Sequence, residues 1–395
     1  MSLVSRTLED LSRRRQTLLD GNINSLPPPF PRFKDDFIGF EQGSYVIVSS
    51  FTKGGKTQFT LNMLFKALDY VYKHQDIVRM RVFYYNLEET AERILQRFIC
   101  WLLEEKSGIR ISGRDLRSSS KDNPVDESIL KLLREKEYME YLEFFEKVFT
   151  FSTTSNPTGI YKECKKYAEE HGTIHTKKAK YKDELGVLRE TDTFDYYESN
   201  DPFEYRFVVV DHISLIDSES GLTKKQSIDK LSEYLAKHLR NNYGFSPIVI
   251  QQQSTEAESN ESFKLGRVRP SIMGLSDSKY TARDGNIVFG LFSPYKFGIK
   301  EYLGYDITFF KDNIRFLEVL CNRDGESGGI IALYFDGATC SFYELPKPDD
   351  SVGLQKVYSY IRGNRSSHQI KSFFIKTFNR LTNGKNFSIG KKRIW

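Results

Sequence analysis

The segment from residue 50 to residue 57 carries the clearest chemistry in this sequence. It reads Ser-Phe-Thr-Lys-Gly-Gly-Lys-Thr, which is typical of a phosphate-binding loop. In such loops, backbone N–H groups surround the phosphates, and glycines such as Gly54 and Gly55 let the backbone approach closely. Lys56 is expected to reach the terminal phosphates, and the Thr57 hydroxyl to hold Mg²⁺. The pattern therefore predicts ATP and Mg²⁺ as cofactors, with these residues around the nucleotide: Ser50, Phe51, Thr52, Lys53, Gly54, Gly55, Lys56, Thr57 and Gln58.

The loop departs from the usual pattern at Ser50, where most phosphate-binding loops carry glycine. A surface turn before a helix is the alternative interpretation. The flanking residues favour the phosphate loop, because an apolar strand at 45–48 precedes it and an amphipathic helix begins near Thr57.

Three polar residues follow other predicted strands. Glu88 comes after the strand at 82–85, Asp211 ends the apolar run at 207–211, and Gln253 follows the strand at 247–250. Since ligands bind at the carboxyl ends of strands in open α/β sheets, these side chains are expected near the phosphate loop. We interpret Asp211 as a magnesium ligand, Glu88 as the carboxylate that polarises water, and Gln253 as a sensor of the γ-phosphate. Taken singly, they could equally be a helix cap, a surface acid and a loop amide.

The elements that must position these residues alternate between strands and helices. Helices are predicted at 158–171 and 227–241, and further strands at 149–151, 287–292, 316–321 and 330–335, the last two as a hairpin around 322–325. The fold class is thus α/β, with a mostly parallel central sheet flanked by helices and a C-terminal hairpin. Residues 173–206 are polar and charged and predict an inserted hairpin or loop.

The two ends of the chain differ from this core. Residues 1–25 predict a helix, and prolines at 27–29 and 31 an extended connector, a device suited to packing against a neighbouring subunit. Residues 351–395 hold no acid and ten basic residues, which leaves residues 1–350 at −5 once these ten charges are subtracted from the formal +5. This basic tail could follow a nucleic-acid backbone or an acidic partner, or could simply be a solvated tail. We expect an N-terminal segment 1–40, an ATPase domain 41–346 and a tail 347–395.

Composition points to a soluble, cytoplasmic protein. The four cysteines are scattered without paired spacing, which argues against a disulfide framework or a zinc ribbon. No stretch approaches the length of an apolar membrane span, so no membrane partner is expected.

The order of these motifs resembles the RecA-like ATPase domain of the DnaB family of replicative helicases, from about residue 14 to residue 344. The loop and residues 58–62 resemble the family's P-S-M-G-K-T-A-F-A-L-N, in which the first loop position is often alanine. Residues 86–88 match S-L-E, 211–216 resemble D-Y-L-Q-L, 247–253 resemble P-V-V-A-L-S-Q, and 269–278 partly match R-P-x-x-x-D-L-R-x-S. Residues 321–325 stand where the family has K-Q-R-N-G, so Arg323 retains its arginine, whereas Cys321 replaces its lysine.

The resemblance implies a replicative helicase, of a phage or mobile-element type, that moves 5′ to 3′ on single-stranded DNA as a homo-hexamer. Glu88 would be the catalytic base, Lys56 and Gln253 would act on the phosphates, and Arg323 would reach a neighbour's nucleotide. Primase or other replisome proteins would be partners. DNA would be contacted by loops at 218–225 and 254–269, through Lys224, Lys225, Lys264, Arg267 and Arg269. Two alternatives stay open: a RecA-type recombinase or recombination mediator, and a non-catalytic nucleotide-binding structural or virion-associated protein.

Overall fold

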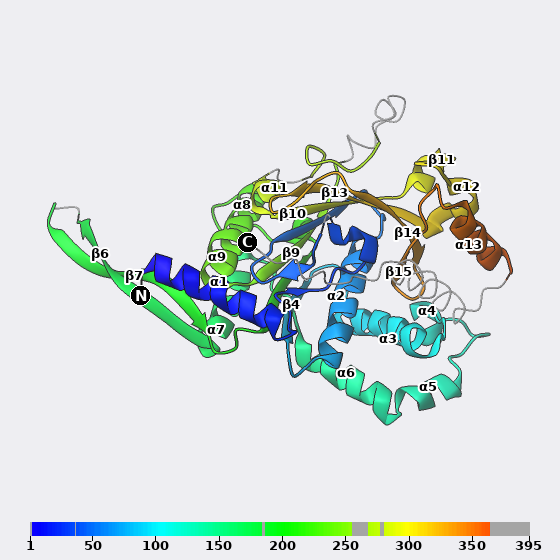
Figure 1. Cartoon of the computed structure of the whole chain (residues 1–395), viewed down its shortest axis with the longest axis horizontal. Coiled ribbons are helices and arrows are strands. Elements are labelled where there is room, and N and C mark those ends of the chain that lie inside the picture. The colour runs from blue at the N-terminus through cyan, green and yellow to red at the C-terminus, as the bar shows by residue number, and fades with distance from the viewer. Residues whose placement is uncertain (1, 36, 184–185, 255–267, 277–279, 364–395) are drawn as a thin grey trace, which may run out of the picture. The chain divides into compact units, whose positions relative to one another are not determined.

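The computed structural model describes residues 2–35, 37–183, 186–254, 268–276 and 280–363 (Figure 1). The chain divides into two compact units. The first unit contains residues 1–94, 127–293 and 316–331, and the second contains residues 95–126, 294–315 and 332–395. Every site residue predicted above that the structure describes falls in the first unit. The domain boundaries predicted from the sequence stay predictions.

The first unit is built on a sheet in which six neighbouring strands run parallel, and an antiparallel seventh lies at one side. Their order is β13-β10-β3-β9-β8-β4-β5. The bounds are β3 (Val46–Ser50), β4 (Arg79–Asn86), β5 (Phe149–Ser152), β8 (Glu204–Asp211), β9 (Ser246–Gln252), β10 (Ile287–Phe292) and β13 (Ile314–Asn322). The predicted α/β class with a mostly parallel sheet is confirmed. The long apolar runs in β3, β8 and β9 reflect burial on both faces.

Helices cover both faces of this sheet. On one face, α7 (Pro157–Glu170) and α8 (Lys224–Glu233) pack Ile160 and Leu231 into a buried cluster with Ile47 and Val210. The α8 helix runs on through a π-helical stretch (Tyr234–Arg240) into α9 (Asn241–Tyr243). On the other face, α2 (Lys56–Lys73) brings Phe59 within 6.4 Å of Phe289, centroid to centroid, and is joined by α6 (Lys136–Val148). Shorter elements of this unit are α5 (Glu127–Leu133) and α11 (Tyr280–Asp284).

The N-terminal region lies within the first unit. Helix α1 (Leu3–Leu19) is shorter than the helix predicted for residues 1–25, because the chain leaves the helical conformation at Asp20 and Gly21. In and after the proline-rich stretch, Phe30, Phe33 and Phe37 pack into the core. The strand before the prolines, β1 (Ser25–Leu26), pairs with β2 (Phe40–Glu41), which follows them. The predicted connector is therefore partly a core element, because its phenylalanines cover Phe289 of the sheet.

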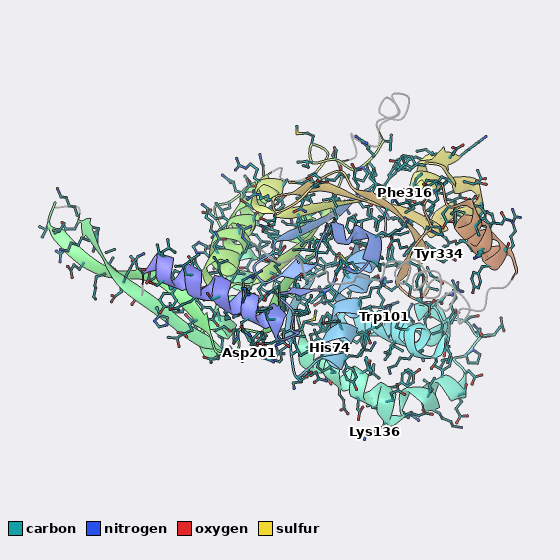
Figure 2. All side chains as sticks on the ribbon, viewed as in Figure 1. His74, Trp101, Lys136, Asp201, Phe316 and Tyr334 are labelled. Carbon is teal, nitrogen blue, oxygen red and sulfur yellow. The ribbon has the colours of Figure 1, made fainter. Side chains whose placement is uncertain are left out.

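The insertion forms an antiparallel hairpin of β6 (Gly172–Lys182) and β7 (Leu188–Ser199). In Figure 1 it projects from the other elements of the first unit, and α1 lies along it. Asp201, labelled in Figure 2, lies two residues beyond the end of β7 and accepts a hydrogen bond from Arg79 Nε at 2.6 Å, which fixes the point where the hairpin returns to β8.

The second unit contains elements that the sequence did not reveal, chiefly between residues 294 and 313. It comprises α3 (Ala91–Ser107) from Leu95 onward, α4 (Gly113–Leu116), β11 (Glu301–Tyr302), β12 (Tyr305–Asp306), α12 (Ile307–Phe310), β14 (Ile330–Asp336) from Ala332 onward, β15 (Ser341–Glu344) and α13 (Ser351–Gly363). Glu104 on α3 is buried and accepts hydrogen bonds from Ser341 and Tyr343 on β15, both at 3.0 Å. Burial raises the pKa of Glu104. The first residues of the predicted tail form α13, and residues 364–395 lie outside the described residues.

Candidate nucleotide site

The phosphate loop connects β3 to α2, as predicted. Lys53 and Gly55 adopt positive φ angles of 56° and 97°, and Gly55 is the N-cap of α2. Gly54 is required by packing, since a Cβ there would lie 1.7 Å from Ser50 Oγ and 2.9 Å from Phe51 O. Ser50 is buried and its hydroxyl donates to Phe51 O at 3.2 Å. Serine at position 50 is therefore compatible with the loop, because Gly54 has no side chain and lets the backbone pass close to the Ser50 hydroxyl.

Lys56 lies inside the loop. Its side chain is buried, and Nζ donates to Ser50 O at 3.4 Å and to Phe51 O at 3.3 Å. The positive charge is therefore held where the loop's backbone N–H groups and the N-terminus of α2 also favour an anion.

Thr57 and Asp211 lie 154 positions apart in the sequence and meet at the phosphate loop. Thr57 Oγ1 donates to Asp211 Oδ1 at 3.0 Å, and Tyr84 donates its hydroxyl to Asp211 Oδ2 at 2.7 Å. The parallel register that pairs Asn86 with Asp211 brings the end of β4 beside the end of β8. Burial raises the pKa of Asp211 to about 6, although the Tyr84 and Thr57 hydrogen bonds lower it. The nearby Glu88 raises it further.

A magnesium ion fits this pair of oxygen ligands. Mg²⁺ takes hydroxyl, carboxylate, water and phosphate oxygens, and usually needs only one or two protein ligands when phosphates are present. Among the described residues, no group of three or more His, Cys, Asp or Glu side chains could hold a metal ion by itself. A cation here would depend on the bound phosphates as well as on Thr57 and Asp211.

Glu88 lies on the turn after β4. The N–H of Leu87 donates to Asp211 O at 3.1 Å, which ties this turn to the end of β8. The Glu88 side chain is half exposed, and its Oε2 lies 3.9 Å from His212 Nε2. The carboxylate therefore stands at the solvent side of the loop and of Asp211, where a water molecule has access.

Gln253 is buried beside the phosphate-loop strand. Its amide Nε2 donates to Ser49 Oγ at 2.7 Å and to Ser271 O at 3.1 Å, and its Oε1 accepts from the Ser271 N–H at 3.2 Å. Gly274 gives it room, since a Cβ there would lie 2.2 Å from Oε1. Gln253 thus connects β3 to the segment at 271–274.

Arg323 is not brought to the loop of its own chain. It is exposed, its backbone N–H donates to Asn286 O at 3.0 Å, and its guanidinium donates to Arg283 O. Cys321 is half-buried and packs against the core cluster. These contacts hold Arg323 beside Asn286 and Arg283, not at the phosphate loop of its own chain.

The predicted DNA-contacting residues do not all lie in loops, and two of them lie outside the described residues. The structure corrects the start of one helix: α8 begins at Lys224, not near Ser227, because Thr223 and Gln226 form a capping box. Lys224 and Lys225 therefore begin a helix, and Lys224 Nζ donates to Ile216 O. Arg269 is exposed, whereas Lys264 and Arg267 lie outside the described residues.

Sequence reasoning missed Tyr84, Ser49 and His212. All three contact a predicted site residue through the bonds given above. Tyr84 has the pattern of a core aromatic on a buried strand, and only the pairing of β4 with β8 places its hydroxyl at Asp211. His212 and Ser49 each adjoin a site residue in sequence, which is the one signal that could have drawn attention to them.

Comparison with known proteins supports the fold. No protein-family model and no curated protein matches the sequence. Many solved structures resemble it, and two of them serve as examples. One is described as an ATPase domain, with a TM-score of 0.61 and 15% identity, covering 88% of this chain and 100% of that one. The other is a DnaB-like replicative helicase studied with primase, with a TM-score of 0.57 and 15% identity, covering 87% of this chain and 66% of that one.

The chain therefore has a RecA-like α/β fold. More particularly, the fold is that of the ATPase domain of DnaB-like replicative helicases, as the sequence motifs predicted. No helix in the described part of the chain is both long and apolar enough to cross a membrane.

Proposed function

We propose that this protein is an ATP-dependent DNA helicase of the DnaB-like type, which translocates on single-stranded DNA. One observation carries the proposal: the phosphate loop, the Thr57–Asp211 pair and Glu88 converge at one edge of a sheet whose fold is shared with DnaB-like helicases. A lone phosphate loop would indicate only nucleotide binding. The added carboxylate beside a magnesium-type site is what hydrolysis requires.

Each residue of the site has a role in the proposed reaction. Lys56 and the loop N–H groups bind the phosphates, and Gln253 senses the γ-phosphate through its connection to the segment at 271–274. When bound, Mg²⁺ neutralises charge on the phosphates. Glu88 orients and polarises the attacking water from the solvent side.

The position of Arg323 supports an oligomer. Because its side chain does not reach the loop of its own chain, it is available to a nucleotide held by a neighbouring copy. An arginine supplied in this way can contribute about a thousandfold or more to hydrolysis. We propose a homo-hexamer with ATP at subunit interfaces, although Cys321 in place of the family's lysine removes one charge from this contact.

The proposed contacts with DNA are made by basic residues. Lys225 and Arg269 are exposed in the structure, and Lys264 and Arg267 are included from the sequence. Positive charge of this kind grips a single strand without reading its bases. Primase or other replisome proteins, a cytoplasmic location and a role in DNA replication belong to the same proposal.

Strand displacement on a forked duplex tests the helicase assignment. We expect the wild-type chain to unwind the fork with ATP and Mg²⁺, and Glu88→Gln to bind the fork without unwinding it. Homologous strand exchange without unwinding would instead indicate a recombinase. Nucleotide binding with neither activity would indicate a structural protein.

A further inference from the structure

Arg323 is anchored on one short segment of its own chain, residues 283–286, where α11 ends and β10 is about to begin. Its backbone N–H donates to Asn286 O at 3.0 Å, and its guanidinium donates to Arg283 O. The first of these bonds continues the antiparallel pairing of β10 with β13 beyond the ends of the two strands. The position of Arg323 therefore depends on the position of this segment.

Arg240 binds the same segment. Its Nη1 donates to Asp284 O at 2.7 Å and to Asn286 Oδ1 at 2.9 Å. Ser232, on α8, donates to Asp284 Oδ2 at 2.6 Å. Helix α8 and its π-helical continuation thus hold the segment through two side chains, and α8 lies beside α11 (Figure 1).

The π-helical stretch explains how two side chains eight positions apart reach one segment. In an uninterrupted α-helix, positions i and i+8 point about 80° apart. A π-turn closes with i→i+5 bonds and contains more residues than an α-turn, so the stretch 234–240 turns Arg240 back toward the side of Ser232. Such turns are rare in proteins and frequent at functional sites.

Two guanidinium groups lie near each other at this segment. Burial lowers the pKa of Arg240, the charge of Arg323 lowers it further, and nearby carboxylates raise it. The bond from the Arg323 guanidinium ends on a neutral carbonyl, and a charged phosphate oxygen is a stronger acceptor. The side chain of Arg323 can therefore pass from Arg283 O to a phosphate while its backbone stays bound to Asn286.

We propose that Arg240 is a positioning residue for Arg323. Arg240 fixes the segment 283–286 through two hydrogen bonds, and this segment fixes the point from which Arg323 extends to the nucleotide of a neighbouring copy. A displacement of about 1 Å can lower the rate of an enzyme about a hundredfold, so the loss of these bonds should be visible in hydrolysis. The inference rests on the proposed function, because Arg323 acts there on another subunit.

Mixed assemblies of two inactive full-length chains test this role. In the donor chain, Glu88→Gln removes the carboxylate and leaves Arg323 in place. In the acceptor chain, Arg323→Ala leaves the nucleotide site intact. An acceptor site next to a donor receives the donor's Arg323, so hydrolysis should return when the two chains are mixed.

Arg240→Met in the donor keeps the aliphatic stem and removes both hydrogen bonds. We expect it to lower the restored kcat at least about tenfold with an unchanged KM for ATP, and Arg240→Lys, which keeps a charged donor, to recover part of the loss. Arg240→Met in the acceptor should cause no further loss, because that chain already lacks Arg323. Lys237→Met in the donor is the control: Lys237 lies on the same π-helical stretch but pairs with Glu233, at 2.7 Å, and its loss should leave the restored rate unchanged.

The outcomes separate this inference from the function on which it rests. An unchanged rate with Arg240→Met in the donor, or an equal loss from the same change in the acceptor, would overturn the positioning role alone. No hydrolysis in the mixture of the two parent chains would refute hydrolysis at subunit interfaces and this inference together.

Amide hydrogen exchange measures the link without ATP turnover. Arg240→Met should speed exchange at least about tenfold in peptides covering 283–287 and 321–325, with unchanged circular dichroism, whereas Lys237→Met should not. Unchanged exchange at 321–325 in Arg240→Met would show that Arg240 does not hold Arg323, and would overturn the inference whatever the mixed assemblies do.

Discussion

Replacing Asp211 with asparagine should stabilise the fold while destroying turnover. Burial raises the pKa of this carboxyl to about 6, against an ordinary value of about 3.9. The folded state therefore holds the proton more tightly than the unfolded chain. Stability from this group is fully present below about pH 4 and is lost as the pH rises through 6.

The size of the effect follows from the shift. Two pKa units at 1.36 kcal/mol each give about 3 kcal/mol of destabilisation by the ionised carboxylate above pH 7. Asp211→Asn removes the charge and keeps the shape, and its side-chain oxygen can still accept from Tyr84. We expect the variant to be more stable than wild type by about 3 kcal/mol at pH 8, with the difference vanishing near pH 4.

Urea unfolding from pH 4 to pH 8 without magnesium measures this difference. The exposed Asp76→Asn is the control and should show no such pH-dependent gain. Adding Mg²⁺ and nucleotide should stabilise the wild type and leave Asp211→Asn almost unaffected. A gap that does not change with pH, or a variant that is less stable at pH 8, would refute the reasoning.

Three further predictions concern single contacts of the site. Gly54→Ala should weaken nucleotide binding at least about tenfold in a fluorescence titration, because its Cβ meets Ser50 Oγ, and adding Ser50→Ala should restore part of the affinity. Tyr84→Phe removes a hydrogen-bond donor to Asp211 and should raise the pKa of that carboxyl by about one unit. Mg²⁺-dependent nucleotide binding should then shift to higher pH, and an unchanged pH midpoint of binding would contradict this. Arg323→Ala should lower hydrolysis by about a thousandfold with nucleotide binding retained, and normal turnover by this variant would argue against hydrolysis at subunit interfaces.

The parts of the fold that the sequence predicted are those with local patterns. The strand before Ser50, the helix after Gly55 and the apolar run ending at Asp211 carry their own periodicity, and each appears where expected. The hydrogen bond from Tyr84 to Asp211 spans 127 positions and depends on strand order, which no local pattern contains. The short elements between residues 294 and 313 were missed for a related reason: two-residue strands are too short to show alternation.

For the insertion, the sequence predicted the type of element but not the contacts between its strands. Its charge and length predicted a hairpin or loop, and it is a hairpin. The pairing of lysines on β6 with acids on β7 depends on a register that includes a bulge between His175 and Thr176. A one-residue slip would reverse which side chains share a face, so the sequence alone could not distinguish a hairpin with matched charges from a basic one.

The stimulation of ATP hydrolysis by single-stranded DNA tests the central claim most directly. Hydrolysis is measured with and without DNA for the wild-type chain and for Glu88→Gln, with nucleotide binding followed in parallel. The proposed function predicts that DNA accelerates wild-type hydrolysis, and that Glu88→Gln binds ATP normally but hydrolyses it at least about a hundredfold more slowly. Hydrolysis that ignores DNA, or that survives in Glu88→Gln, would contradict the assignment of this site to a DNA motor.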